Sequence, residues 1–128
     1  IFILDHENRH RYTAAYKRQN EADRNRWVVS SYFESGWFHD GTEMRPLPVS
    51  LDLESLYHSL LKNLIPLEPR RDERMDDLVA RAELAGIKER EAERMEARLN
   101  REKQFNRKVE LNAELRNLRN EIDNLKST

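Results

Sequence analysis

The stretch RYTAAYK, residues 11–17, decides how the first part of the chain folds. Residues at alternate positions of an extended chain share a face. One face carries Tyr12, Ala14 and Tyr16. The opposite face carries Arg11, Thr13 and Lys17. This alternation predicts a half-buried β-strand.

Two further strands are predicted around this one. Residues 1–4 form a short apolar run, and residues 5–8 have the composition of a turn. After a polar stretch, residues 27–33 form a third run, in which strict alternation places Trp27, Val29 and Phe33 on one face. Consecutive strands with short connections usually pair as antiparallel neighbours, so we expect a three-stranded meander.

A helix is predicted to cover this sheet. After the extended segment that contains Pro46 and Pro48, Ser50 is placed to cap a helix that has acidic residues in its first turn. Its apolar residues recur with helical spacing, which produces one continuous stripe: Leu53, Leu56, Tyr57, Leu60, Leu61 and Leu64. Pro66 and Pro69 are expected to end the helix.

Composition divides the chain further. Of its 128 residues, 23 are Lys or Arg and 24 are Asp or Glu, and the formal net charge is −1. Residues 70–126 are rich in charge, have no proline and consist mostly of strong helix formers. We therefore expect an α+β fold: a small antiparallel β-meander covered by one amphipathic helix at 1–69, followed by a long helical or coiled-coil arm at 70–128.

The arm shows three apolar patterns. One apolar face lies near the start of the arm and consists of Met75, Leu78, Val79 and Ala82. Gly86 follows it and either ends this helix or only weakens it. The run after Gly86 predicts a helix of about 40 residues, roughly 60 Å long.

The end of the arm carries an apolar seam with the 4-3-4-3 spacing of a coiled coil: Leu111, Leu115, Leu118, Ile122 and Leu125. Phe105 and Val109 mark a second face, because Val109 and Leu111 are about 200° apart around the helix. The seam predicts a homodimer or helical docking to a larger subunit.

Several classes of protein are disfavoured. The apolar runs are shorter than the roughly 20 residues of a membrane helix, and we expect a cytoplasmic protein without a membrane partner. The chain has no cysteine, and its histidines lack the spacing of a zinc motif. Neither a catalytic residue nor a cofactor or metal site is assigned. Because the chain begins at Ile1 inside an apolar run, we expect an upstream part to be missing.

The strand region offers an alternative function. Arg9, Arg11, Lys17 and Arg18 are interleaved with aromatic residues, a composition that suits contact with the phosphates and bases of nucleic acid. A metal-dependent nuclease is the second form of this alternative, and its candidate side chains are Asp5, Glu7, Lys17 and Glu34. Ala15 occupies the position two residues before Lys17, where such a site would want a carboxylate.

Three segments carry a resemblance. The first comprises residues 16–23 followed by 27–29 and 32–34. The others are residues 51–57 and residues 102–116, the last of which reads EKQFNRKVELNAELR. Together they resemble a bacterial domain-of-unknown-function family, whose members are similar to accessory proteins encoded beside DNA methyltransferases and helicase-type restriction subunits of phage-defence loci. The resemblance implies a context in DNA restriction-modification or phage defence and supplies no catalytic residue. Together with the seam, this context leads us to expect a non-catalytic accessory protein that assembles through its helical arm.

Overall fold

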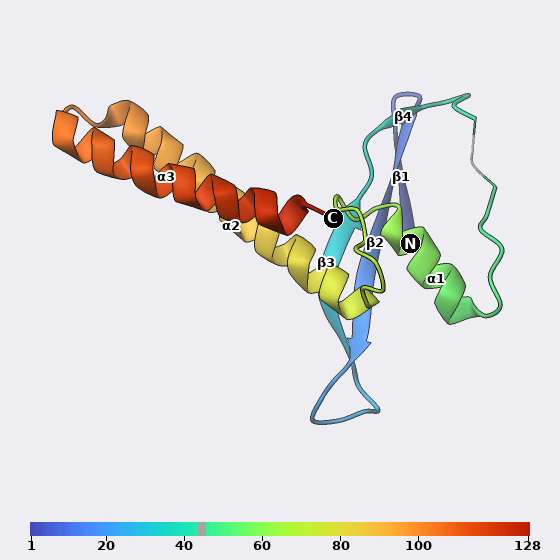
Figure 1. Cartoon of the computed structure of the whole chain (residues 1–128). Helices are drawn as coiled ribbons and strands as arrows, with labels where there is room; N and C mark the ends of the chain where they lie inside the picture. The colour runs from blue at the N-terminus through green and yellow to red at the C-terminus, as the bar shows by residue number, and fades with distance from the viewer. Residues whose placement is uncertain (44–45) are drawn as a thin grey trace. The chain divides into compact units, whose positions relative to one another are not determined.

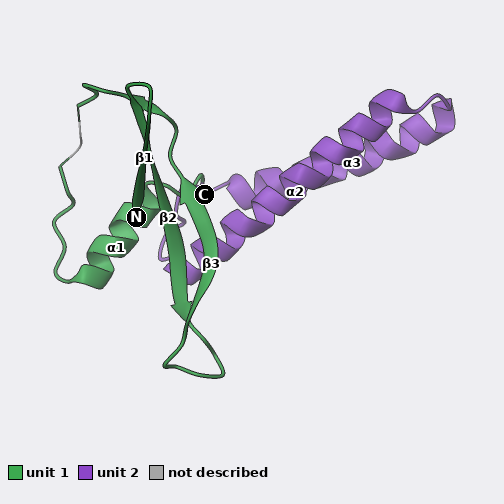
Figure 2. Cartoon of the chain, turned by 180° about the vertical axis from the view of Figure 1, so that it is seen from behind, with its two compact units in different colours: residues 1–66 green, residues 67–128 purple. Residues whose placement is uncertain are grey.

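The computed structural model describes residues 1–43 and 46–128. The chain forms two compact units, residues 1–66 and residues 67–128, which are coloured separately in Figure 2. The composition of the sequence places this boundary after residue 69. Each unit is described by itself below.

The first unit is an antiparallel sheet with one helix (Figure 1). Its strands are β1 (Phe2–His6), β2 (Arg9–Gln19), β3 (Trp27–Glu34) and the two-residue β4 (Phe38–His39). β2 is central, because it pairs with each of the other three strands. The structure confirms the predicted α+β fold and adds β4 to the expected meander.

A two-residue turn joins β1 to β2. Glu7 and Asn8 have φ angles of 46° and 61°, and His6 pairs with Arg9 across the turn. Two consecutive residues with positive φ are typical of a type I′ turn, whose twist matches that of paired strands. The register that follows places Phe2 opposite Thr13.

The faces of β3 differ from the prediction. Phe33 lies opposite Ala14, and both are buried. Farther along, the register shifts between Tyr16 and Lys17, so that Lys17 lies opposite Val29. This bulge adds one residue to β3 and moves Trp27 and Val29 to the face opposite Phe33. The expectation of one shared face was wrong because a one-residue shift reverses the side-chain alternation.

Helix α1 (Leu53–Lys62) packs on the sheet. Its N-cap is Asp52 rather than the predicted Ser50: Asp52 Oδ1 accepts a hydrogen bond of 2.7 Å from the amide of Ser55. This bond also lowers the pKa of Asp52. Leu61 is fully buried, and the ring of His58 lies 6.4 Å from that of Tyr16 on β2. The predicted apolar stripe is therefore covered only in part, because Leu53 at its start is 83% exposed.

The second unit is a helical hairpin of α2 (Met75–Arg101) and α3 (Phe105–Lys126). The expectation of one helix of about 40 residues was wrong, because α2 ends at Arg101 and the chain turns at 102–104. In this turn, Glu102 Oε1 accepts hydrogen bonds from the amides of Lys103 and Gln104. Gly86 lies inside α2 and does not interrupt the helix. The predicted face of Met75, Leu78, Val79 and Ala82 is buried.

Within the described residues, none of the helices combines the length and the apolar character that a membrane crossing requires.

Candidate functional site

The seam of α3 is covered within the chain. Leu111, Leu115, Leu118 and Ile122 are buried, and Leu125 is half-buried. α2 runs beside α3 (Figure 1), and the ion pairs Lys126–Glu89 and Arg119–Glu96 link the two helices at 2.6 and 3.3 Å. The structure thus gives the seam a partner inside one chain. A role for the seam in joining two chains stays a prediction.

The second predicted face of the arm is exposed. Phe105 is 78% exposed and Val109 is 53% exposed, and the two lie one helical turn apart at the start of α3. We call this pair the hairpin patch. It lies directly after the turn that Glu102 stabilises, and the same amide hydrogen bonds from Gln104 and Lys103 lower the pKa of Glu102. The hairpin patch is therefore presented next to a fixed turn.

A buried ion pair, which the sequence analysis missed, organises the base of the hairpin. Two nitrogens of the Arg81 guanidinium, Nε and Nη2, each lie 2.7 Å from an oxygen of the Glu73 carboxylate, and both side chains are nearly buried. The hydrogen bonds from Arg81 lower the pKa of Glu73 from 4.5 to about 2. Arg81 lies among charged residues, so the sequence gave little sign that it is buried. The available signal was its helical spacing, three residues after Leu78 and four before Ala85, because residues at these distances share a helix face.

Arg81 also reaches two backbone carbonyls. It donates hydrogen bonds of 2.6 Å to Leu125 O and 2.8 Å to Glu68 O. Arg70 donates to Asn124 O and Ser127 O at 2.7 and 3.1 Å. The last carbonyls of a helix lack partners within it and attract positive charge. Two arginines thus hold the C-terminus of α3, and this cluster explains the structure of the unit rather than a reaction.

The four predicted nucleic-acid contacts fall into two separate groups on β2. Arg9 and Arg11 lie at its start, with guanidinium carbons 5.8 and 5.0 Å from the centroid of the Trp37 ring. Arg11 also forms an ion pair of 3.0 Å with Glu34. Lys17 is eight residues after Arg9, roughly 26 Å along an extended strand. The sheet therefore does not bring all four residues into one site.

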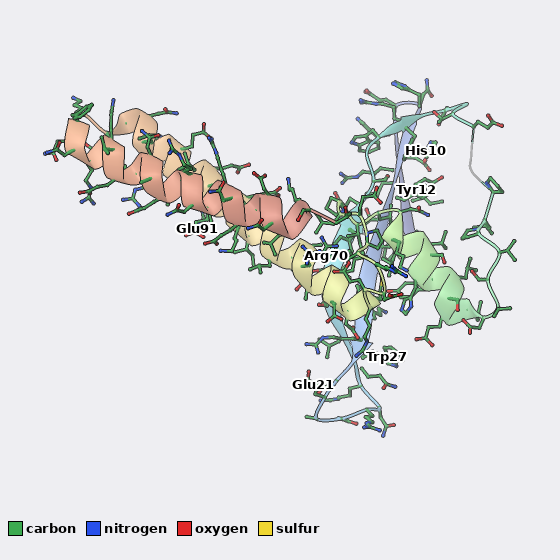
Figure 3. All side chains as sticks on the ribbon, in the orientation of Figure 1. His10, Tyr12, Glu21, Trp27, Arg70 and Glu91 are labelled. Carbon is green, nitrogen blue, oxygen red and sulfur yellow. The ribbon has the colours of Figure 1, made fainter. Side chains whose placement is uncertain are left out.

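The second group lies where β2 passes into β3. Figure 3 labels Glu21 and Trp27 at this end of the sheet and His10 and Tyr12 toward the other. Lys17 and Arg18 are exposed. Trp27 lies opposite Gln19, on the same face of the sheet as Lys17, and is 64% exposed. We call residues 17–29 the ribbon end. It joins basic side chains to an exposed aromatic ring, the pairing from which the sequence analysis inferred nucleic-acid contact.

The candidate nuclease side chains are not assembled. Asp5 lies opposite His10, seven residues from Lys17 on β2, and Glu34 is paired with Arg11. In residues 1–43 and 46–128, no group of three or more His, Cys, Asp or Glu side chains is arranged to hold a metal ion.

Comparison with known proteins gives a family. No curated protein and no solved structure matches the chain. A family model described as a domain of unknown function, DUF4391, matches residues 1–122, which include all of the sheet unit and nearly all of the helical hairpin. The chain therefore belongs to the DUF4391 family.

Proposed function

We propose that this chain is a non-catalytic accessory protein of a bacterial DNA restriction-modification or phage-defence system. In this proposal it acts in the cytoplasm and docks a DNA methyltransferase or a helicase-type subunit through the hairpin patch. The observation that carries the proposal is the exposure of Phe105 and Val109 on a helix whose other large apolar side chains are buried or half-buried.

The packing of the hairpin explains why docking would use the hairpin patch rather than the seam. The seam already packs against α2, so it needs no second chain to exclude water. Phe105 and Val109 are spaced i and i+4 and form one continuous apolar surface on α3. A single exposed apolar residue is ordinary on a protein surface. A Phe and a Val side by side in a highly charged helix resemble the aromatic and aliphatic anchors of protein interfaces.

The choice of partner rests on the resemblance to accessory proteins encoded beside methyltransferases and helicase-type restriction subunits. A second copy of this chain is the other occupant that the sequence analysis expects, and it would use the same apolar surface. Mass measurement separates these two occupants, because a homodimer forms from the isolated chain and a hetero-complex does not.

The test is a pull-down of the chain with neighbouring restriction subunits, followed by mass determination of the complex. Phe105→Asp with Val109→Asp should weaken the complex by about 100-fold or more, because each anchor is worth about 2 kcal/mol or more and both are replaced by charge. Asn117→Asp with Asn120→Asp is the matched control, since it adds the same two charges at exposed positions of α3.

The outcome decides the role of the patch. Retention of the complex by the double Asp variant, with its helix content unchanged, rules out docking through the hairpin patch. Substitutions at Leu115 and Leu118, which the seam pattern suggests, would be a poor test. These residues are 4% and 8% exposed, and a charge there would disrupt the hairpin itself.

A further inference from the structure

We propose that the ribbon end binds single-stranded nucleic acid, with its basic side chains on the phosphates and Trp27 stacked on a base. This inference is independent of the proposed docking role, because it concerns the sheet unit and not the helical hairpin. A variant that loses the hairpin patch should therefore keep this activity.

The first support is the bulge in β3. Ala15 lies opposite Tyr32, and Lys17 lies opposite Val29, so the bulge places Trp27 on the same face as Tyr32. Both aromatic side chains are 64% exposed. Lys17 lies on this same face, between the levels of the two rings. The face therefore alternates ring, cation and ring, which fits a strand whose bases and phosphates alternate.

The second support is a preformed loop. Asn20 Oδ1 accepts a hydrogen bond of 2.8 Å from the amide of Ala22, and Asp23 Oδ1 accepts one of 3.0 Å from the amide of Asn25. The backbone closes with a hydrogen bond of 2.8 Å from the amide of Asn20 to Arg26 O. These bonds fix the loop before any ligand arrives, which lowers the entropy cost of binding.

The third support is the charge of the ribbon end. It carries four basic residues and two acidic residues, a formal charge of +2 in a chain whose total is −1. Glu21 and Asp23 lie near Arg18 and Arg26, at 3.2 and 4.0 Å. These are exposed pairs, which water screens well and which phosphates can replace at little cost. The basic residues are Lys17, Arg18, Arg24 and Arg26.

Arg9 and Arg11, the other basic group on β2, are less suited to bind nucleic acid than the ribbon end. Arg9 and Arg11 lie over the Trp37 ring, and Glu34 pairs with Arg11 at 3.0 Å. The acidic residues Asp5, Glu7 and Asp40 surround this end of the sheet. Their negative charge repels phosphate, whereas the ribbon end is positive.

The test uses the fluorescence of Trp27. The chain has two tryptophans, so Trp37→Phe leaves Trp27 as the only reporter and keeps an aromatic ring for Arg9 and Arg11. Titration with single-stranded oligothymidine or oligouridine of about 15 nucleotides, at about 50 mM salt, should quench this fluorescence. The two oligomers distinguish DNA from RNA as the preferred strand.

Two sets of variants distinguish the contribution of base stacking to binding from the contribution of charge. Trp27→Leu should weaken binding by about 5- to 100-fold, whereas Trp27→Phe should retain most of the affinity because it keeps a ring. Lys17→Ala with Arg24→Ala should reduce the slope of log K against log salt by about 1.4. Arg71→Ala with Arg74→Ala, which removes the same charge from the helical unit, should leave the slope unchanged.

Three results would overturn the inference. They are absence of binding at low salt, equal affinity of Trp27→Leu and the parent chain, and a matched duplex that binds as tightly as the single strand. Circular dichroism of each variant shows whether it is folded, so that a loss of binding can be assigned to the substituted side chain. The double Asp variant of the hairpin patch should bind the oligomers normally, which separates this outcome from that of the docking proposal.

Discussion

At the scale of single residues, Arg81 joins three segments of the helical unit. Its guanidinium bonds to Glu73 before α2, to Glu68 O in the preceding segment and to Leu125 O at the end of α3. A buried charge is tolerated only when it is paired and its donors are satisfied. Loss of Arg81 would leave the Glu73 carboxylate without its main partner, so this residue should tolerate substitution poorly.

The ion pair predicts a specific dependence of stability on pH. The folded pKa of Glu73 is about 2, below its ordinary value of 4.5, so its contribution is complete above pH 4.5 and is lost as the pH falls toward 2. Glu73→Gln should lower the free energy of unfolding at pH 7 by about 2 kcal/mol and show a smaller loss in acid. Urea unfolding across this range measures both effects. Equal pH profiles of parent and variant would contradict the assignment, and Glu114→Gln at an exposed position is the control.

At the scale of elements, Tyr57 connects α1 to the edge of β2. Its hydroxyl donates a hydrogen bond to Ala15 O and accepts one of 3.3 Å from the amide of Lys17. These two backbone groups lie just beyond the pairing of β1, which ends with Phe2 opposite Thr13. The Tyr57 hydroxyl thus satisfies backbone groups that a neighbouring strand would otherwise pair with, and it protects part of an open sheet edge.

Removal of this hydroxyl should expose the edge. Tyr57→Phe is expected to lower the free energy of unfolding by about 1 kcal/mol, because the ring is kept and only the hydrogen bonds are lost. The amide of Lys17 should also exchange its hydrogen faster, which nuclear magnetic resonance can follow. Tyr32→Phe, at a ring that is 64% exposed, is the matched control and should change neither quantity. Unchanged exchange at Lys17 would show that Tyr57 does not protect the edge.

Local patterns predicted most of the elements, and each error has a physical cause. The alternation around Ala14 and the stripe from Leu53 to Leu64 identified β2 and α1, because burial on one face requires that spacing. The bulge in β3 has no comparable signature, since Ser30 and Ser31 suit either register. The chain reversal at 102–104 had no local signature either, because residues 87–128 contain no glycine or proline. Phe105 and Val109 were identified as a separate face, and the structure leaves them exposed.

At the scale of the whole molecule, the chain carries two kinds of surface on two units. The sheet unit has buried residues at Ala14, Phe33 and Leu61, whereas the hairpin buries Leu78 and the seam. Sequence composition also differs between these regions, because most aromatic residues precede position 39 and the charged helix formers follow position 70. It could not anticipate Arg81, since burial of a charge depends on partners that are distant in sequence.

The division into two units predicts that a substitution that destabilises one unit leaves the other unit folded. Leu115→Asp places a carboxylate at a position that is 4% exposed and should destabilise the hairpin by several kcal/mol, because the charge has no partner in the seam. Amide hydrogen exchange should rise throughout α2 and α3 while the paired amides of β2 and β3 stay protected. Asn117→Asp adds the same charge at an exposed site two residues away and should change neither unit. If β2 loses its protection together with α3, the two units unfold as one, because a cooperative transition exposes all of its amides at the same free energy.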